Sequence, residues 1–154
     1  MATTIRIHEA PTGPPLAVRA ATAAWLLAVG SGVAETVVGV IGAIGDDTPV
    51  VAIAAQIAFR AVVYGSLFVI IDRYFRQGVP WSRWLLAGLL GIVGLATLVI
   101  GPLQWLITNG DFTTLHPDAT FATFAAIRTV HILAVLAAVP LMFAPDANRW
   151  FHRK

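Results

Sequence analysis

The chain has 154 residues, of which 58% are apolar and 12% are charged. A typical soluble domain has about 45–50% apolar and about 25% charged residues, so this composition excludes an ordinary soluble globular domain. Its 10 basic and 8 acidic residues leave a formal net charge of +2, and the absence of cysteine excludes disulfides and thiolate metal sites.

Four apolar stretches have the length that a bilayer requires, because a helix needs roughly 20 residues to cross a hydrocarbon core of about 30 Å. They predict an all-α fold with four transmembrane helices, and the short connections favour an up-down-up-down antiparallel bundle. We expect a flexible N-terminal tail over residues 1–19 and a basic C-terminal tail over 144–154. The membrane domain, 20–143, should contain spans at 20–44, 50–71, 84–106 and 121–143.

The basic residues outside the spans indicate the orientation. They precede the first span, separate the second from the third and follow the fourth, whereas aspartates are the charged residues of the other two loops. By the positive-inside rule, both termini and the middle loop are cytoplasmic, which predicts a multi-pass protein of the cell inner (cytoplasmic) membrane. Because the charges follow the loops, nucleic acid is not an expected partner. The basic residues are Arg6, Arg19, Arg73, Arg76, Arg83, Arg149, Arg153 and Lys154, and the aspartates are Asp46, Asp47, Asp111 and Asp118.

Aromatic residues occur where the predicted helices meet the lipid headgroups. Tryptophan and tyrosine are enriched at this depth in membrane proteins, so we expect these side chains to act as membrane anchors. They are Tyr74, Phe75, Trp81, Trp84, Trp105, Phe112, Trp150 and Phe151.

The first predicted span carries one acid, Glu35, in a run without another charge until Asp46. Ser31, Gly32 and Gly39 share a helix face with it at i, i+3 and i+4 spacing. Small residues in such a stripe let membrane helices approach closely, so we expect these three to be helix-packing positions.

The other spans add polar or small faces. In the second, Gln56, Arg60 and Tyr64 are spaced by four, which places two hydrogen-bonding side chains beside the guanidinium. Gly91 and Gly94 give the third span an uncharged face for close packing. Arg128 and His131 in the fourth are three residues apart and so project together.

Glu35, Arg60, Arg128 and His131 should lie in one layer, because each is about 12–16 Å from the outer end of its helix at 1.5 Å per residue. An ionisable side chain at this depth costs roughly 2.5–3.5 kcal/mol, so such groups normally find partners inside the protein. One carboxylate against two guanidiniums leaves a surplus positive charge. A ligand carboxylate or phosphate, a lipid headgroup or an acidic residue of a partner helix would balance it, and water in an outward-facing vestibule would do so without a ligand.

No catalytic residues, metal site or cofactor are expected. His131 has no second histidine at its depth, because His8, His116 and His152 lie outside the spans. The layer contains neither cysteine nor paired acids, and its serines are expected to pack between helices. Asp118 is expected to cap the fourth helix.

Two segments, "AAWLLAVGSGVAETVVGV" and "RYFRQGVPWSRWLLAGLLGIVGLATLVI", resemble small four-helix integral membrane proteins of actinobacteria. The resemblance extends over residues 20–143 and implies a cytoplasmic-membrane protein without implying an activity. "VAETVVG" is also similar to the first helix of the small multidrug resistance exporters, whose membrane glutamate couples protons to cationic substrates. Here Arg60 and Arg128 would keep Glu35 ionised and repel such a cation.

The sequence therefore leaves two functions open. The first is a non-enzymatic helix bundle that is accessory to another membrane protein or associates with itself. The alternative is a small transporter or binding protein for an anionic or proton-coupled solute, which uses the Glu35, Arg60, Arg128 and His131 layer.

Overall fold

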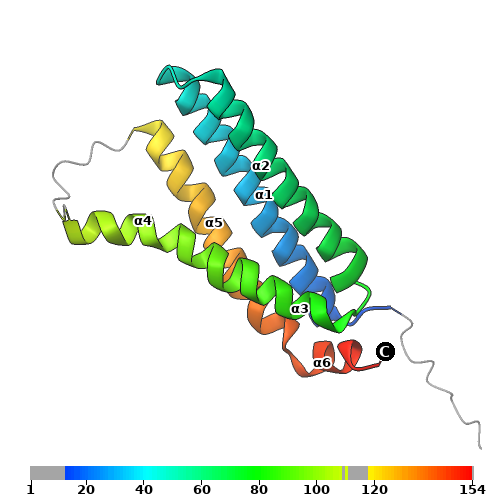
Figure 1. Ribbon diagram of the computed structural model, residues 1–154. Helices are drawn as coiled ribbons and strands as arrows, with labels where there is room; N and C mark the ends of the chain where they lie inside the picture. The colour runs from blue at the N-terminus through cyan, green and yellow to red at the C-terminus, as the bar shows by residue number, and fades with distance from the viewer. Residues whose placement is uncertain (1–12, 109, 111–117, 154) are drawn as a thin grey trace, which may run out of the picture.

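The computed structural model describes residues 13–108, 110 and 118–153, and these residues form helices without a strand (Figure 1). Four long helices are apolar enough to cross a membrane, as expected for a multi-pass membrane protein. They cover Leu16–Gly45, Val50–Phe75, Pro80–Thr108 and Ala119–Met142.

Two of the long helices contain π-helical segments. The second consists of α2 (Val50–Val69) and η1 (Ile70–Phe75), and the third of α3 (Pro80–Leu86), η2 (Ala87–Gly94) and α4 (Leu95–Thr108). The first and fourth are α1 (Leu16–Gly45) and α5 (Ala119–Met142). The short helix α6 (Pro145–Phe151) follows within the segment expected to be a tail.

Local sequence explains where the helices begin. Pro15 precedes α1 with extended backbone, and Pro80 occupies the first turn of α3, where its missing N–H costs no hydrogen bond. The cap predicted for the fourth helix is confirmed, because Asp118 Oδ1 accepts a hydrogen bond of 2.7 Å from the Phe121 amide. Residues 1–12 of the expected N-terminal tail and 111–117 of the expected outer loop lie outside the described residues.

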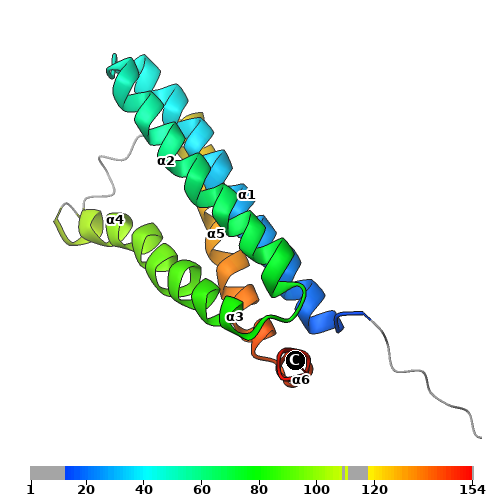
Figure 2. The ribbon, with the colours of Figure 1, turned by 45° about the vertical axis from the view of Figure 1, so that its right-hand side comes forward.

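α1 lies between α2 and α5. Figures 1 and 2 show α1 and α2 side by side, while the α3–α4 helix crosses the others and leads away from them at its α4 half. The start of α1, the end of α5 and α6 lie at one end of the molecule, here called the terminal end; the 46–49 turn lies at the distal end. The third helix therefore lies close to the others near the terminal end, and its α4 half is separated from α1 and α2, which stay side by side up to the distal turn (Figures 1 and 2).

The buried apolar core lies mainly at the terminal end. It joins the first half of α1, the end of α2, η1, the start of the third helix, the end of α5 and α6. Its members are Val18, Ala21, Trp25, Ala28, Val29, Leu67, Ile71, Phe75, Leu86, Leu90, Ala134, Val135, Ala138, Met142, Ala147 and Phe151.

Two of the expected membrane anchors belong to this core instead. Phe75 and Phe151 are buried, and their ring centroids lie 5.2 Å apart. Their placement differs from the expectation because α6 packs back against η1, which brings the two rings into contact within the core. Tyr74, Trp81 and Trp84 remain exposed, as side chains in contact with lipid would be.

Candidate functional site

The candidate site is built on α1, the helix between α2 and α5. Consecutive residues in an α-helix point about 100° apart, so Glu35 and Thr36 reach different neighbours. Glu35 contacts side chains of α5, and Thr36 contacts a side chain of α2. The polar layer of this helix is therefore divided between two interfaces.

Glu35, Arg128 and His131 form the first group, here called the Glu35 cluster. Glu35 Oε2 lies 3.6 Å from Arg128 Nη2, and Glu35 Oε1 lies 3.7 Å from His131 Nδ1. Glu35 and His131 are each only 8% exposed, and the Arg128 side chain is 27% exposed. The structure thus brings together the acid and two of the three basic groups expected in one layer.

Electrostatic attraction, rather than hydrogen bonding, dominates the Glu35 cluster. Its nitrogen–oxygen distances exceed the usual 2.7–3.2 Å range for such hydrogen bonds. Glu35 Oε1, His131 Nδ1 and Arg128 Nε are buried and have no hydrogen-bond partner among the described residues. Opposite charges attract more strongly away from water, so the cluster holds α1 against α5.

Arg128 is also positioned by its own helix. Its guanidinium carbon lies 4.6 Å from the centroid of the Phe124 ring, which is one turn earlier in α5. A guanidinium over an aromatic face is a favourable cation–π arrangement. Phe124 therefore helps to direct Arg128 toward Glu35.

Arg60 lies at the other interface of α1. Its Nη1 donates a hydrogen bond of 3.0 Å to Thr36 Oγ1, and the Thr36 hydroxyl donates one of 2.8 Å to the Gly32 carbonyl. Within the described part of the chain, no carboxylate lies within 4.0 Å of its guanidinium. The expected four-residue layer is therefore two separate groups, because α1 keeps α2 away from the α5 side of Glu35.

The two side chains expected to support Arg60 are placed differently. Tyr64 packs over Gly32, where an added methyl group would lie 2.8 Å from Tyr64 Oη. Gln56 is exposed, one turn nearer the distal end. Tyr64 thus fixes the contact between α1 and α2, whereas Gln56, on the same face of α2, is left exposed nearer the distal end.

The expected packing positions also differ from one another. Ser31 and Gly32 are buried, and a methyl group at Gly91 would lie 3.2 Å from Val139 Cγ2 of α5. A methyl group at Gly94 would approach the Leu89 carbonyl of its own helix, also at 3.2 Å. Gly39 departs from the expected stripe, because it is exposed and has open space around it.

One buried cation was not expected from the sequence. Arg83, assigned to the cytoplasmic loop by its charge, is only 7% exposed, and its Nη1 donates a hydrogen bond of 2.6 Å to Asn148 Oδ1 of α6. Aromatic rings surround its guanidinium. The segments "WSRW" and "NRWF", in which arginine stands beside aromatic residues, are the sequence pattern that could have indicated this site. The rings are those of Trp84, Phe143 and Phe151, whose centroids lie 5.4–5.5 Å away.

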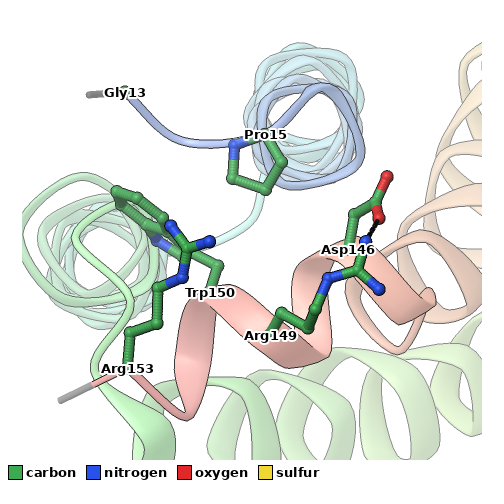
Figure 3. A pocket seen from close by; sticks show the side chains of 6 residues that line it. All are labelled: Gly13, Pro15, Asp146, Arg149, Trp150 and Arg153. Atoms are coloured by element: carbon green, nitrogen blue, oxygen red, sulfur yellow. Dashed lines mark hydrogen bonds and ion pairs between the residues drawn. The ribbon is translucent and has the colours of Figure 1, made fainter. Parts of the chain in front are cut away.

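The five hollows identified on the described surface lie outside the Glu35 cluster. Three surround the terminal end, and Figure 3 shows one of them, with Trp150 and Arg153 on one side and the Arg149–Asp146 ion pair on the other. The fourth lies between α1 and α5 near the distal end, and the fifth follows α1 and α2 beside Arg60. None of the five is lined by Glu35, Arg128 or His131.

Within the described ranges, no three His, Asp or Glu side chains gather as a metal site would require. Comparisons with protein-family models, with curated proteins and with solved structures found no match to this chain. Its function must therefore be argued from its own geometry.

Proposed function

We propose that the chain is a non-enzymatic multi-pass protein of the cytoplasmic membrane that works by lateral association of its helices. It is accessory to another membrane protein or associates with itself. Both termini lie in the cytoplasm in this proposal, because the basic residues around α6 and the η1–α3 connection would then face the cytoplasm.

The main support for this proposal is the Glu35 cluster, in which Glu35 and His131 are buried. Its acid is already opposed by Arg128 and His131, and none of the five hollows opens on these three residues. This largely buried ion pair joins α1 to α5, with 27% of the Arg128 side chain left exposed. The charged residues of the α1–α5 interface therefore support a structural role.

The distribution of exposed apolar surface is the second support. α2 and α4 contribute little to the core, and most of their large side chains are exposed along their length. The exposed sides of these helices offer long lateral faces to lipid or to another helix. Association between membrane helices depends on close packing and hydrogen bonds across such faces.

Photo-crosslinking in intact membranes tests this function. A photoreactive residue replaces one exposed side chain at a time on α1, α2, α4 or α5, at Val37, Val62, Ile107 or Leu133. We expect a discrete protein adduct from at least one of these faces, because a lateral partner would lie within reach of it. Lipid adducts alone at all four positions would overturn the proposal.

A second candidate is favoured by the buried atoms of the Glu35 cluster that lack hydrogen bonds. Glu35 Oε1 and His131 Nδ1 face each other at 3.7 Å without a hydrogen bond. These two groups could therefore exchange a proton, or bind a small anion when His131 is protonated. In this alternative the chain is a small transporter or binding protein.

The Glu35→Gln variant separates the two candidates. It preserves shape and removes the negative charge, so it should abolish solute or proton flux in reconstituted vesicles if the cluster transports. Loss of stability without any change in a measurable flux supports the structural role. Normal stability combined with lost flux would replace the proposed function with transport.

A further inference from the structure

The fifth hollow is a groove between α1 and α2, and its walls are almost entirely apolar. Val33, Val37 and Ile41 of α1 form one wall, and Ile57 and Tyr64 of α2 form the other. Val37 and Ile41 are 54% and 65% exposed, so other described residues leave this groove open. Arg60 is the one charged side chain that lines it.

The position of Arg60 along α2 corresponds to the middle of a membrane that this helix would cross. It follows Val50, the first residue of α2, by ten positions, which corresponds to about 15 Å along the helix. Long basic side chains usually extend toward the nearest membrane surface. The hydrogen bond to Thr36 Oγ1 keeps the Arg60 guanidinium from extending toward that surface. Thr36 lies nine residues before Gly45, the last residue of α1, and so is itself about 14 Å from the end of its helix.

The charge of Arg60 is not balanced within the described residues. Glu35 is the one acid in the four expected spans, and it pairs with Arg128 and contacts His131 at the other interface of α1, with α5. A guanidinium has five N–H donors, and the structure shows one of them bonded, to Thr36. With His131 counted as neutral, Glu35 and Arg128 balance each other, so the formal surplus of one positive charge is located at Arg60, in an apolar groove.

An apolar groove with one unbalanced guanidinium indicates what kind of group could bind in it. Charged groups within a membrane normally pair with each other, and a planar guanidinium suits a carboxylate. A phospholipid phosphate lies at the membrane surface, about 15 Å from the depth of Arg60 when the bilayer core is about 30 Å thick. A second copy of the chain could offer only Glu35 from its expected spans, which is already paired.

We propose that the α1/α2 groove receives a transmembrane helix of a different protein, and that this helix carries an Asp or Glu near its centre that pairs with Arg60. The apolar walls contact the apolar part of the incoming helix. The carboxylate accepts hydrogen bonds from the free N–H groups of Arg60, while Thr36 holds the guanidinium in place. This inference rests on the proposed function and specifies the partner of one lateral face.

The test uses a synthetic transmembrane peptide of about 22 residues, a length that suits the bilayer core. The peptide is rich in leucine and carries one central Asp, and the matched control peptide has Leu at that position. The full chain carries a donor dye on a single Cys replacing Gln77, since it has no native cysteine. Energy transfer to an acceptor on the peptide is measured in phosphatidylcholine vesicles, whose lipids have no net charge.

We expect the Asp peptide to bind about 3- to 30-fold more tightly than the Leu peptide, the range expected for about 0.6–2 kcal/mol from a hydrogen bond within a membrane. Arg60→Gln should remove this difference, and Arg60→Lys should retain part of it. Circular dichroism must show unchanged helix content in both variants. Equal binding of the two peptides to the native chain, or an unchanged difference in Arg60→Gln, would overturn the inference.

A double variant shows whether the groove itself matters. Arg60→Gln/Val62→Arg keeps the net charge and moves the arginine to a nearby exposed position on another face of α2. Binding of the Asp peptide should not recover, because the new guanidinium lies outside the groove and lacks Thr36. Full recovery would show that any arginine facing lipid suffices, which contradicts a docking groove.

Two further measurements show whether a second copy of the chain or an anionic lipid occupies the α1/α2 groove instead. If chains labelled with donor and acceptor transfer energy to each other without peptide, and Arg60→Gln abolishes this, the occupant is a second copy. If phosphatidylglycerol in the vesicles abolishes selective binding of the Asp peptide, the occupant is an anionic lipid. Either result overturns the inference.

The proposed function fails independently of this inference. Protein adducts from α4 or α5 in native membranes, combined with no selective peptide binding, would leave lateral association intact and exclude this groove as the acidic-helix site. Absence of protein adducts from all tested faces would instead overturn the proposed function itself.

Discussion

Glu35 contributes to the contact between α1 and α5 through its ion pair with Arg128. Replacing it with Gln leaves the guanidinium of Arg128 partly buried without its counter-charge. Removing one member of a buried ion pair usually costs 3–5 kcal/mol. We expect a loss of about 3 kcal/mol, at the lower end of this range because the Arg128 side chain keeps 27% exposure.

Unfolding of the purified protein by denaturing detergent measures this loss. The control is Glu35→Gln/Arg128→Met, which removes both charges and should recover much of the lost stability. A Glu35→Gln variant as stable as the native chain would show that the Glu35 cluster does not hold the two helices together.

Gly32 provides a matched test of the contact between α1 and α2. A methyl group at this position would lie 2.8–3.0 Å from three atoms of Tyr64, so Gly32→Ala forces the ring to move. Overpacking of this kind typically costs 1–3 kcal/mol, and we expect about that decrease in stability to detergent. Gly30→Ala is the control, because nothing lies within 4 Å of its added methyl group. Equal effects of the two substitutions would contradict the packing described here.

At the residue scale, the sequence predicts how deep each polar side chain lies along its helix, but not which side chain of a neighbouring helix it contacts. Glu35, Arg60 and Arg128 lie at similar distances from their helix ends, which can be counted from the sequence alone. Which neighbour each side chain meets depends on how α1 is rotated between two helices. A rotation of about 100° separates Glu35 from Thr36, and this places Arg60 in a different interface.

At the element scale, α6 is joined to the rest of the molecule by Arg83 and Asn148. Asn148 accepts a hydrogen bond from Arg83 Nη1, and its own Nδ2 donates one of 2.9 Å to the Phe143 carbonyl. Asn148→Ala removes both bonds and leaves the buried Arg83 guanidinium without its acceptor. A charged group that loses its hydrogen-bond partner in this way costs about 1.5–3 kcal/mol.

Hydrogen exchange should detect this loss locally. We expect faster exchange of the α6 amides in Asn148→Ala and little change in the middle of α1. Arg149→Ala is the control, because that side chain is 68% exposed and pairs with Asp146 of the same helix. Unchanged exchange of α6 in Asn148→Ala would show that apolar contacts alone hold this helix.

The sequence pattern predicts the long helices, but not the short helix α6 or the π-helical segments. Hydropathy locates the long helices, and Asp118 marks the start of α5. A charged, aromatic C-terminal segment is equally typical of a tail, and only the fit of Phe151 against Phe75 makes it a buried helix. The π-helical segments η1 and η2 depend on a shifted backbone hydrogen-bond pattern, such as the bond from the Arg76 amide to the Ile71 carbonyl, which hydropathy and residue spacing do not determine.

At the scale of the whole molecule, the proposed orientation can be tested directly because the chain contains no cysteine. Single cysteines replace Thr48 in the distal turn, Gln77 near the end of η1 and His152 after α6. With a membrane-impermeant maleimide on intact cells, we expect labelling at Thr48 only, since the basic segments should remain in the cytoplasm. Labelling at Gln77 and His152 instead of Thr48 would reverse the proposed orientation.

Lateral association is the central claim, and native mass spectrometry of the protein released directly from its own membranes tests it most directly. Complexes assembled through membrane helices should appear at the mass of this chain plus another membrane protein, or at a multiple of its own 16.4 kDa. Recovery of the single chain alone, under conditions that keep other membrane complexes intact, would contradict the claim.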